Sequence, residues 1–219
     1  MQQNFTFKQA ILVFVLAVIW TLSVVSAIYY YAIDLDFSLE VLIHGGIIIM
    51  ILLFMHYKQR SNRSFLLSDD LQSIKLTVRF SIIALLTGLG LFILDTISSV
   101  YILQDDIQQQ AQSLVTQANK EGLVSTTLAI CLLAPLMEEM LFRGVLLPAF
   151  TYKNKQYIGI ISSAILFSLI HFSVEEAIIL FVAGVSFGFL RVKSNSIWPP
   201  FLAHFTNNTL TWSIYMSMN

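Results

Sequence analysis

Glu138, Glu139 and Arg143 lie inside an otherwise apolar stretch, LMEEMLFR, at residues 136–143. Ionisable groups at membrane depth cost about 2.5–3.5 kcal/mol each even on the lenient insertion scales, so they indicate a functional site by default. Their partners must then come from elsewhere in the chain, and His171 and His204 lie in later apolar segments. Together these residue types predict a site of acid–base chemistry within a bilayer.

The spacing of the two glutamates predicts different roles. Positions four apart share one face of a helix, whereas adjacent positions diverge. Glu139 and Arg143 are four apart, so we expect a structural ion pair along the helix. Glu138 points elsewhere and is left to face a partner and to exchange a proton. The alternative is that both glutamates only neutralise Arg143 at a helix end.

Three more polar residues are candidates for the same site. His171 comes late in the fifth apolar segment, and His204 and Asn208 are four apart on one face of the last. A lone histidine on an apolar helix is commonly a packing residue. Their coincidence with a glutamate pair favours a shared site.

The composition is that of an integral membrane protein. The 219 residues are 57% hydrophobic and 11% charged, with a mean hydropathy of +0.77, against about 25% charged in soluble domains. The formal net charge of −1 and the lack of a basic block give no sign of a nucleic-acid partner. Cys131 is the single cysteine, so an intramolecular disulfide is excluded, and we expect a buried thiol.

The hydropathy pattern predicts an all-α, polytopic membrane bundle of about seven transmembrane helices, with the site on the fourth, fifth and seventh. The first is read as a retained helix, not a signal peptide. The sixth is short and could be a partial span, and Gly184 and Gly188 in it suit close helix packing. We divide the chain into 1–123, three helices plus a polar connector at 105–121, and 124–219, the catalytic core. The segments run over 9–32, 38–57, 79–103, 124–148, 157–174, 177–191 and 196–217.

Basic residues cluster in alternate loops, which predicts a cytoplasmic N-terminus and an external C-terminus. If the sixth segment does not cross, the C-terminus moves inside. Asp95 and the Glu40–His44 pair are read as structural or interfacial. The basic residues on the cytoplasmic side are Lys8, Lys58, Arg60, Arg63, Lys75, Arg79, Lys153, Lys155, Arg191 and Lys193.

Three ordered motifs carry a family resemblance: EExxxR at 138–143, FxxxH at 167–171 and HxxxN at 204–208. The set resembles the signature of the CPBP family, the CAAX-processing and bacteriocin-processing intramembrane proteases, also called Abi. It spans the fourth segment to the end of the chain, and the first three segments carry no motif. The resemblance implies a membrane endopeptidase whose prenyl-processing relatives have catalytic positions matching Glu138, His171, His204 and Asn208.

The resemblance also implies a membrane-anchored peptide or protein as substrate and the lipid bilayer as surroundings. A compact chain of this kind looks more like a bacterial member, in the cell membrane, acting on small membrane peptides. Two alternatives come from other classes. One is a non-catalytic bacteriocin-immunity or membrane binding protein, and the other is a small proton-linked transporter.

Two mechanisms fit the candidate residues. In the metal-free version Glu138 and His171 activate water, and His204 and Asn208 donate hydrogen bonds to the oxyanion. In the other, Glu138, His171 and His204 bind zinc or another divalent metal. Asn208 is a poor zinc ligand but a good oxyanion donor, which favours the first, and no cofactor is firmly implied.

The depths in the membrane that we expect for the candidate site residues differ from one another. At about 1.5 Å per residue, Glu138 and His204 lie on the order of 10–15 Å deep and His171 near 20 Å. These residues meet only if the fourth helix extends past Pro148 or the fifth begins later or tilts.

Overall fold

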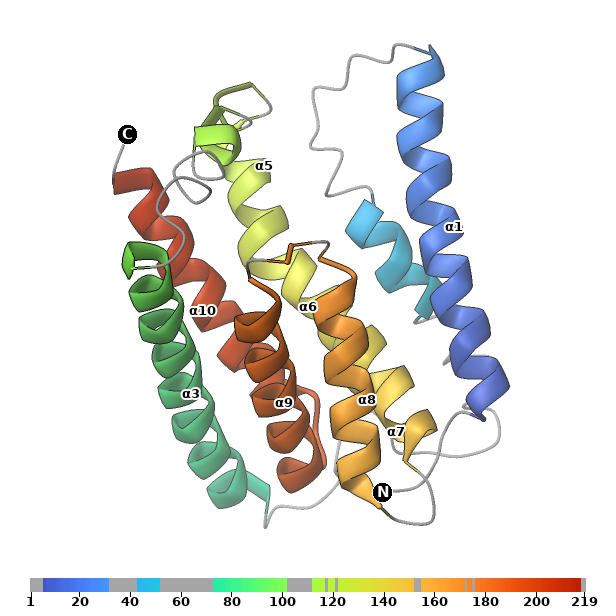
Figure 1. Ribbon diagram of the computed structural model, residues 1–219, viewed down its shortest axis with the longest axis vertical. Helices are drawn as coiled ribbons and strands as arrows, with labels where there is room; N and C mark the ends of the chain where they lie inside the picture. Colours follow the sequence, from blue (N-terminus) through green and yellow to red (C-terminus); the bar gives the residue numbers. More distant parts are fainter. Residues whose placement is uncertain are drawn as a thin grey trace.

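The computed structural model is a bundle of helices (Figure 1). It describes residues 6–31, 43–51, 73–101, 112–116, 118–120, 122–151, 155–171, 173–174 and 176–217, and no strand occurs within these ranges. The long helices are α1 (Phe7–Tyr31), α3 (Ser73–Tyr101), α8 (Gln156–Leu169), α9 (Ala177–Ser194) and α10 (Trp198–Ser217). The predicted all-α membrane bundle is confirmed.

Three of the described helices contain windows long and apolar enough to cross a membrane: Phe7–Val24, Val78–Ser98 and Ala177–Ser194. Large apolar side chains such as Leu22 and Leu86 are exposed on α1 and α3, as a lipid-facing surface requires. The third window is all of α9, so the sixth segment has the length and composition of a span. The total of seven spans stays a prediction.

The described helices run alternately up and down the bundle, and α1 begins at the end opposite to where α10 finishes (Figure 1). This arrangement agrees with an odd number of crossings. The side that faces the cytoplasm stays a prediction, as does the division of the chain after residue 123. Glu40, His56 and most of the second segment lie outside the described residues.

The fifth helix is shorter than the sequence predicts. α8 ends at Leu169, so His171 lies in a turn beyond the helix and not within it. Ser168 Oγ donates to the carbonyl of Ala177 at 2.7 Å, and the His171 N–H bonds to the Ser168 carbonyl at 3.3 Å. These bonds turn the chain toward α9, although the sequence there is still apolar and predicts that the helix continues.

The fourth segment is one helix of changing winding. It runs through α5 (Leu123–Leu128), η1 (Ala129–Leu133), α6 (Ala134–Glu138), η2 (Glu139–Leu146) and α7 (Leu147–Phe150), where η1 and η2 are π-helical. Such π turns are rare and occur often at functional sites. The helix passes Pro148 and ends at Phe150, as in one of the alternatives that the depth argument left open.

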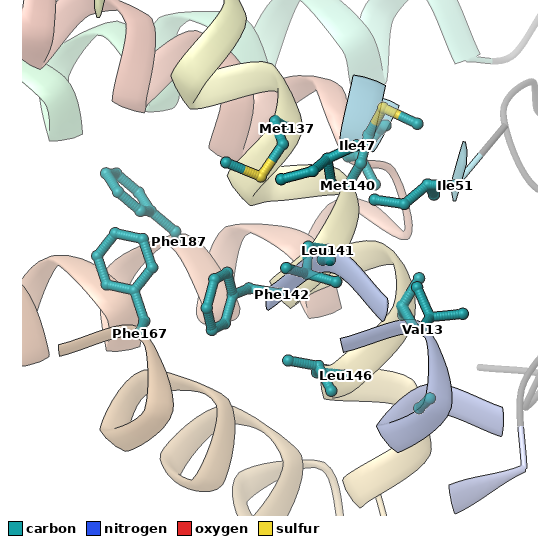
Figure 2. Packing of buried hydrophobic residues seen from close by; sticks show 14 of the residues in the cluster. Val13, Ile47, Ile51, Met137, Met140, Leu141, Phe142, Leu146, Phe167 and Phe187 are labelled. Carbon is teal, nitrogen blue, oxygen red and sulfur yellow. The ribbon is translucent and has the colours of Figure 1, made fainter. Parts of the chain in front are cut away.

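Small residues let neighbouring helices pack closely around this segment. A Cβ on Gly184 of α9 would lie 3.0 Å from Ala164 Cα of α8, and one on Gly188 would lie 3.1 Å from Ile160 Cγ2. The close packing expected of the glycine pair is therefore present. Phe142, Phe167 and Phe187 fill the space where the fourth helix, α8 and α9 meet (Figure 2).

Candidate active site

Glu139 and Arg143 form the ion pair that their spacing predicts. Arg143 Nη1 lies 2.7 Å from Glu139 Oε1, and both side chains are 0% exposed. Arg143 Nη2 also donates to the Gly184 carbonyl at 3.2 Å. The guanidinium carbon lies 4.5 Å from the ring centroid of Phe167 and 5.1 Å from that of Phe187. The arginine is therefore enclosed by one carboxylate, one carbonyl and aromatic faces.

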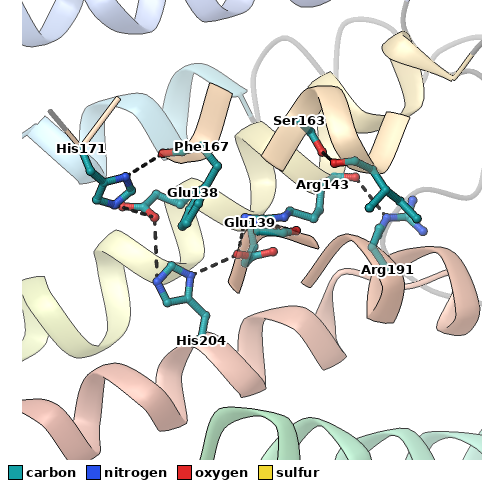
Figure 3. A network of polar contacts seen from close by, with 10 residues as sticks. Glu138, Glu139, Arg143, Ser163, Phe167, His171, Arg191 and His204 are labelled. Carbon is teal, nitrogen blue, oxygen red and sulfur yellow. Dashed lines mark hydrogen bonds and ion pairs between the residues drawn. The ribbon is translucent and has the colours of Figure 1, made fainter. Parts of the chain in front are cut away.

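His204 contacts both glutamates (Figure 3). Its Nδ1 lies 3.1 Å from Glu139 Oε1, and its Nε2 lies 3.8 Å from Glu138 Oε2. Glu139 thus contacts His204 as well as Arg143, because the fourth helix turns the same carboxylate oxygen toward α10. Since an ionised carboxylate only accepts hydrogen bonds, the hydrogen of this contact is on Nδ1. Phe187 stacks on the imidazole, with ring centroids 4.9 Å apart and an interplanar angle of 20°.

His171 faces Glu138 from the other side. Its Nδ1 donates to the Phe167 carbonyl at 2.7 Å, because a carbonyl can only accept. A neutral His171 therefore presents the lone pair of Nε2, which lies 4.0 Å from Glu138 Oε2. The turn after α8, although not foreseen, is what brings this ring to the glutamate.

Glu138 lies on the wall of a cavity of about 220 Å³. Its Oε2 is buried and has no hydrogen-bond partner among the described residues. The separations of 3.8 and 4.0 Å from the two imidazoles are too long for hydrogen bonds. They suit contacts made through one intervening polar atom, such as a water oxygen. His171, His204 and Asn208 line the same cavity.

Asn208 is held by the fourth helix. Its Nδ2 donates to the Ile130 carbonyl at 3.1 Å, and its Oδ1 accepts from Asn207 Nδ2 at 3.4 Å. An amide nitrogen carries two hydrogens, so one N–H remains for a group in the cavity. The structure thus brings together all six predicted residues, from the fourth helix, the turn after α8, and α10.

Three residues near the site were not predicted to belong to it. Phe187 packs on both His204 and Arg143. Arg191 had been placed in a cytoplasmic loop, but it lies in α9, is 5% exposed and donates through Nε to the Arg143 carbonyl at 3.2 Å. Asp95, read as structural, lines the same cavity as Glu138. A charge inside an apolar helix was a usable signal for Asp95 and Arg191, whereas nothing distinguishes Phe187 from other apolar residues.

The described residues contain no group of three or more His, Cys, Asp or Glu side chains arranged to hold a metal ion. The separations of Glu138 from the two imidazoles also exceed those between neighbouring ligands of one zinc ion, about 3.3 Å for bonds of about 2.0–2.1 Å in tetrahedral geometry. The site as arranged here therefore does not fit the zinc alternative.

The family comparison matches the region that contains these residues. Residues 120–210 match the family described as Type II CAAX prenyl endopeptidase Rce1-like. The chain is 27% identical over 78 residues to the "Putative membrane peptidase YdiL" of Bacillus subtilis (strain 168), covering 36% of this chain and 32% of that protein. It is 30% identical over 120 residues to the "Uncharacterized 24.3 kDa protein" of Escherichia coli, covering 51% and 55%. No solved structure matches.

The chain thus spans about a third and about half the length of these two relatives. The family and the first relative support the prediction of a membrane peptidase. All six predicted site residues lie inside the matched region. Residues 120–210 of the chain are thus similar to the Rce1-like family of CAAX prenyl endopeptidases.

Proposed function

We propose that this chain is an intramembrane endopeptidase that hydrolyses a peptide bond in a membrane-associated peptide or protein without a metal. One observation carries the proposal. Glu138 Oε2 lies 4.0 Å from His171 Nε2 and 3.8 Å from His204 Nε2, on the wall of a cavity within the bundle. A carboxylate and two imidazoles around one cavity supply the proton transfers and the charge stabilisation that amide hydrolysis needs.

Glu138 and His171 are the proposed water-activating pair. A water between them donates one hydrogen bond to the carboxylate and one to the Nε2 lone pair of His171. Glu138 takes a proton as the water oxygen attacks the carbonyl carbon of the substrate. The carbon–nitrogen bond then breaks, and the proton passes from Glu138, directly or by way of His171 Nε2, to the leaving amine. Proton transfer of this kind contributes about 10²–10⁴ in rate.

His204 and Asn208 are the proposed oxyanion donors. The hydrogen on Nδ1 of His204 is directed at Glu139, so the ring can donate from Nε2 only as an imidazolium. The Glu139 carboxylate at 3.1 Å stabilises that cation. Asn208 adds its second amide hydrogen. An oxyanion donor contributes about 2.7–4 kcal/mol to transition-state stabilisation.

The expected substrate is a short membrane-anchored peptide or protein, because the cavity lies among helices that face lipid. We further propose a bacterial cell membrane as its location, with a cytoplasmic N-terminus and an external C-terminus. Prenylated CAAX proteins are the substrates that the family's description names. The comparison of membrane-peptide profiles described next also tests whether this chain cleaves them.

The test compares membrane-peptide profiles of cells that express the wild type or Glu138→Gln. We expect at least one membrane peptide to lose its cleaved form and to accumulate uncleaved in the variant. The control is Lys193→Gln, a change of an exposed residue in α9, which is expected to match the wild type. Equal profiles for all three proteins, each present in the membrane in equal amount, would refute the proposal and favour a binding or immunity role.

Metal dependence is a separate measurement. Purified protein is treated with a strong chelator, its metal content is assayed, and cleavage of the peptide found above is followed. Full activity in metal-free protein supports the proposed route. Loss of activity that zinc restores would instead make Glu138, His171 and His204 metal ligands.

A further inference from the structure

The fourth helix contains the same local arrangement twice. The π-helical segment η1 is followed by Pro135, and η2 is followed by Pro148. At the end of η1 the Ala134 N–H bonds to the Ala129 carbonyl. At the end of η2 the Leu147 N–H bonds to the Phe142 carbonyl. Both bonds join residues five apart, the π-helical pattern.

The next bond of each series cannot form. The Ile130 carbonyl would accept from residue 135 and the Arg143 carbonyl from residue 148, and both positions are prolines, which have no N–H. A backbone carbonyl without a donor costs several kcal/mol within a membrane protein. Each proline therefore leaves one carbonyl in need of a partner.

In both places a side chain from another helix supplies the donor. Asn208 Nδ2 of α10 donates to the Ile130 carbonyl at 3.1 Å. Arg191 Nε of α9 donates to the Arg143 carbonyl at 3.2 Å, the contact drawn in Figure 3. At both sites a carbonyl that a proline leaves without an N–H donor is bonded by a side chain from a neighbouring helix.

These two bonds lie on either side of the glutamate pair. Ile130 precedes Glu138 by about two helical turns, and Arg143 follows it by more than one. Holding the backbone at both carbonyls fixes how the helix winds between them. That winding directs Glu138 toward the imidazoles while Glu139 reaches both Arg143 and His204.

We propose that Arg191 is a positioning residue for the glutamate pair, acting as the hydrogen-bond donor that Pro148 removes, and that Asn208 does the same for Pro135. This role of Asn208 is additional to its proposed oxyanion contact, since one amide hydrogen serves each. The effect on turnover rests on the proposed peptidase activity. The effect on stability does not.

The test is a double-mutant cycle between Arg191→Met and Pro148→Ala. Alanine restores an N–H at residue 148, so it can bond to the Arg143 carbonyl when Arg191 cannot. We expect Arg191→Met to lower turnover at least about tenfold in the wild-type background and less than about threefold with Pro148→Ala, which is the coupling expected of a shared hydrogen bond. Thermal unfolding in micelles should show the same coupling.

Two further variants separate this role from others of Arg191. Arg191 Nη1 also lies 3.5 Å from Asn195 Oδ1, and Asn195 has a positive φ of 52°. Asn195→Gly removes only that contact and tolerates the backbone, so turnover and unfolding are expected to stay unchanged. Arg191→Lys retains a donor and is expected to recover part of the turnover that Arg191→Met loses.

The same cycle applies at the other proline, using Asn208→Leu and Pro135→Ala with unfolding as the readout, because Asn208 also has a proposed catalytic contact. Equal losses of turnover from Arg191→Met in the wild-type and Pro148→Ala backgrounds would overturn the positioning role. Failure of both Arg191→Met and Arg191→Met/Pro148→Ala to fold would also overturn it. Coupling in unfolding without any peptidase activity in the wild type would keep this inference and reject the proposed function.

Discussion

Glu138 and Glu139 are neighbours in sequence but lie in different surroundings. Glu139 belongs to what we term the closed cluster: Glu139, Arg143, Phe167, Phe187 and the Gly184 carbonyl. Within this cluster Arg143 makes two polar contacts, at 2.7 Å to the Glu139 carboxylate and at 3.2 Å to the Gly184 carbonyl. Glu138 belongs to the cavity cluster: Glu138, His171, His204 and Asn208. There the carboxylate stands 3.8 and 4.0 Å from its imidazoles. Short contacts bind the closed cluster together, and the longer ones leave room for a reacting molecule.

His204 connects the two clusters. One ring nitrogen contacts Glu139 and the other faces Glu138. Phe187 stacks on the ring from the closed side. The closed cluster can therefore affect the chemistry of the cavity cluster through how His204 is oriented and charged, and also through Phe167, whose carbonyl accepts from His171 Nδ1. Variants that change one cluster should separate activity from stability.

The largest expected effect comes from exchanging the two glutamates for glutamine one at a time. Glu138→Gln removes the proposed base and should lower the rate of peptide cleavage by about 10²–10⁴. Because Glu138 Oε2 has no hydrogen-bond partner among the described residues, unfolding should hardly change. Glu139→Gln should chiefly lower the melting temperature. Initial rates and thermal unfolding measured on the same preparations decide, and equal loss of both properties in both variants would remove the distinction between the clusters.

Arg143→Met tests the closed cluster directly. Removing one partner of a buried ion pair leaves the other charge uncompensated, so we expect a loss of about 3–5 kcal/mol in the free energy of unfolding. The double variant Arg143→Met/Glu139→Gln leaves no unpaired charge and should be more stable than Arg143→Met alone. Denaturant titration of the wild type, both single variants and the double variant measures this. A double variant that loses the sum of both single losses would show that the pair is not a unit.

The cavity cluster could be predicted from the sequence further than its surroundings could. Spacing alone paired Glu139 with Arg143 and set Glu138 apart, because helical periodicity is local information. His204 and Asn208 followed from the same rule. The contact between His204 and Glu139 could not be predicted, since it depends on how α10 packs against the fourth helix. The turn at His171 could not be predicted for a similar reason. It depends on the packing of α8 against α9, where Ser168 bonds to the Ala177 carbonyl.

Gly184→Ala is expected to have a moderate effect on the closed cluster. The added methyl would lie 3.0 Å from the Ala164 backbone, which cannot move aside as a flexible side chain can, so we expect a loss of about 1–3 kcal/mol in unfolding free energy. The matched control is Gly90→Ala, where a Cβ meets nothing within 4 Å. It should be neutral or slightly stabilising, because alanine favours helix. Equal stability of the two variants would contradict the close packing of α8 and α9.

Phe187→Leu should have the smallest effect and the most specific one. The ring stacks on His204 and lies 5.1 Å from the Arg143 guanidinium, and such aromatic contacts contribute about 0.5–1.5 kcal/mol. If the closed cluster acts on the reaction through His204, this variant should lower kcat by up to about tenfold, because about 1.4 kcal/mol corresponds to a factor of ten, and leave KM nearly unchanged. Phe189→Leu is the control, since Phe189 is in the same helix and exposed. A fall in stability with unchanged kcat would confine Phe187 to packing. If the free-energy equivalent of the fall in kcat exceeds the loss in unfolding free energy, His204 is established as a link between the two clusters.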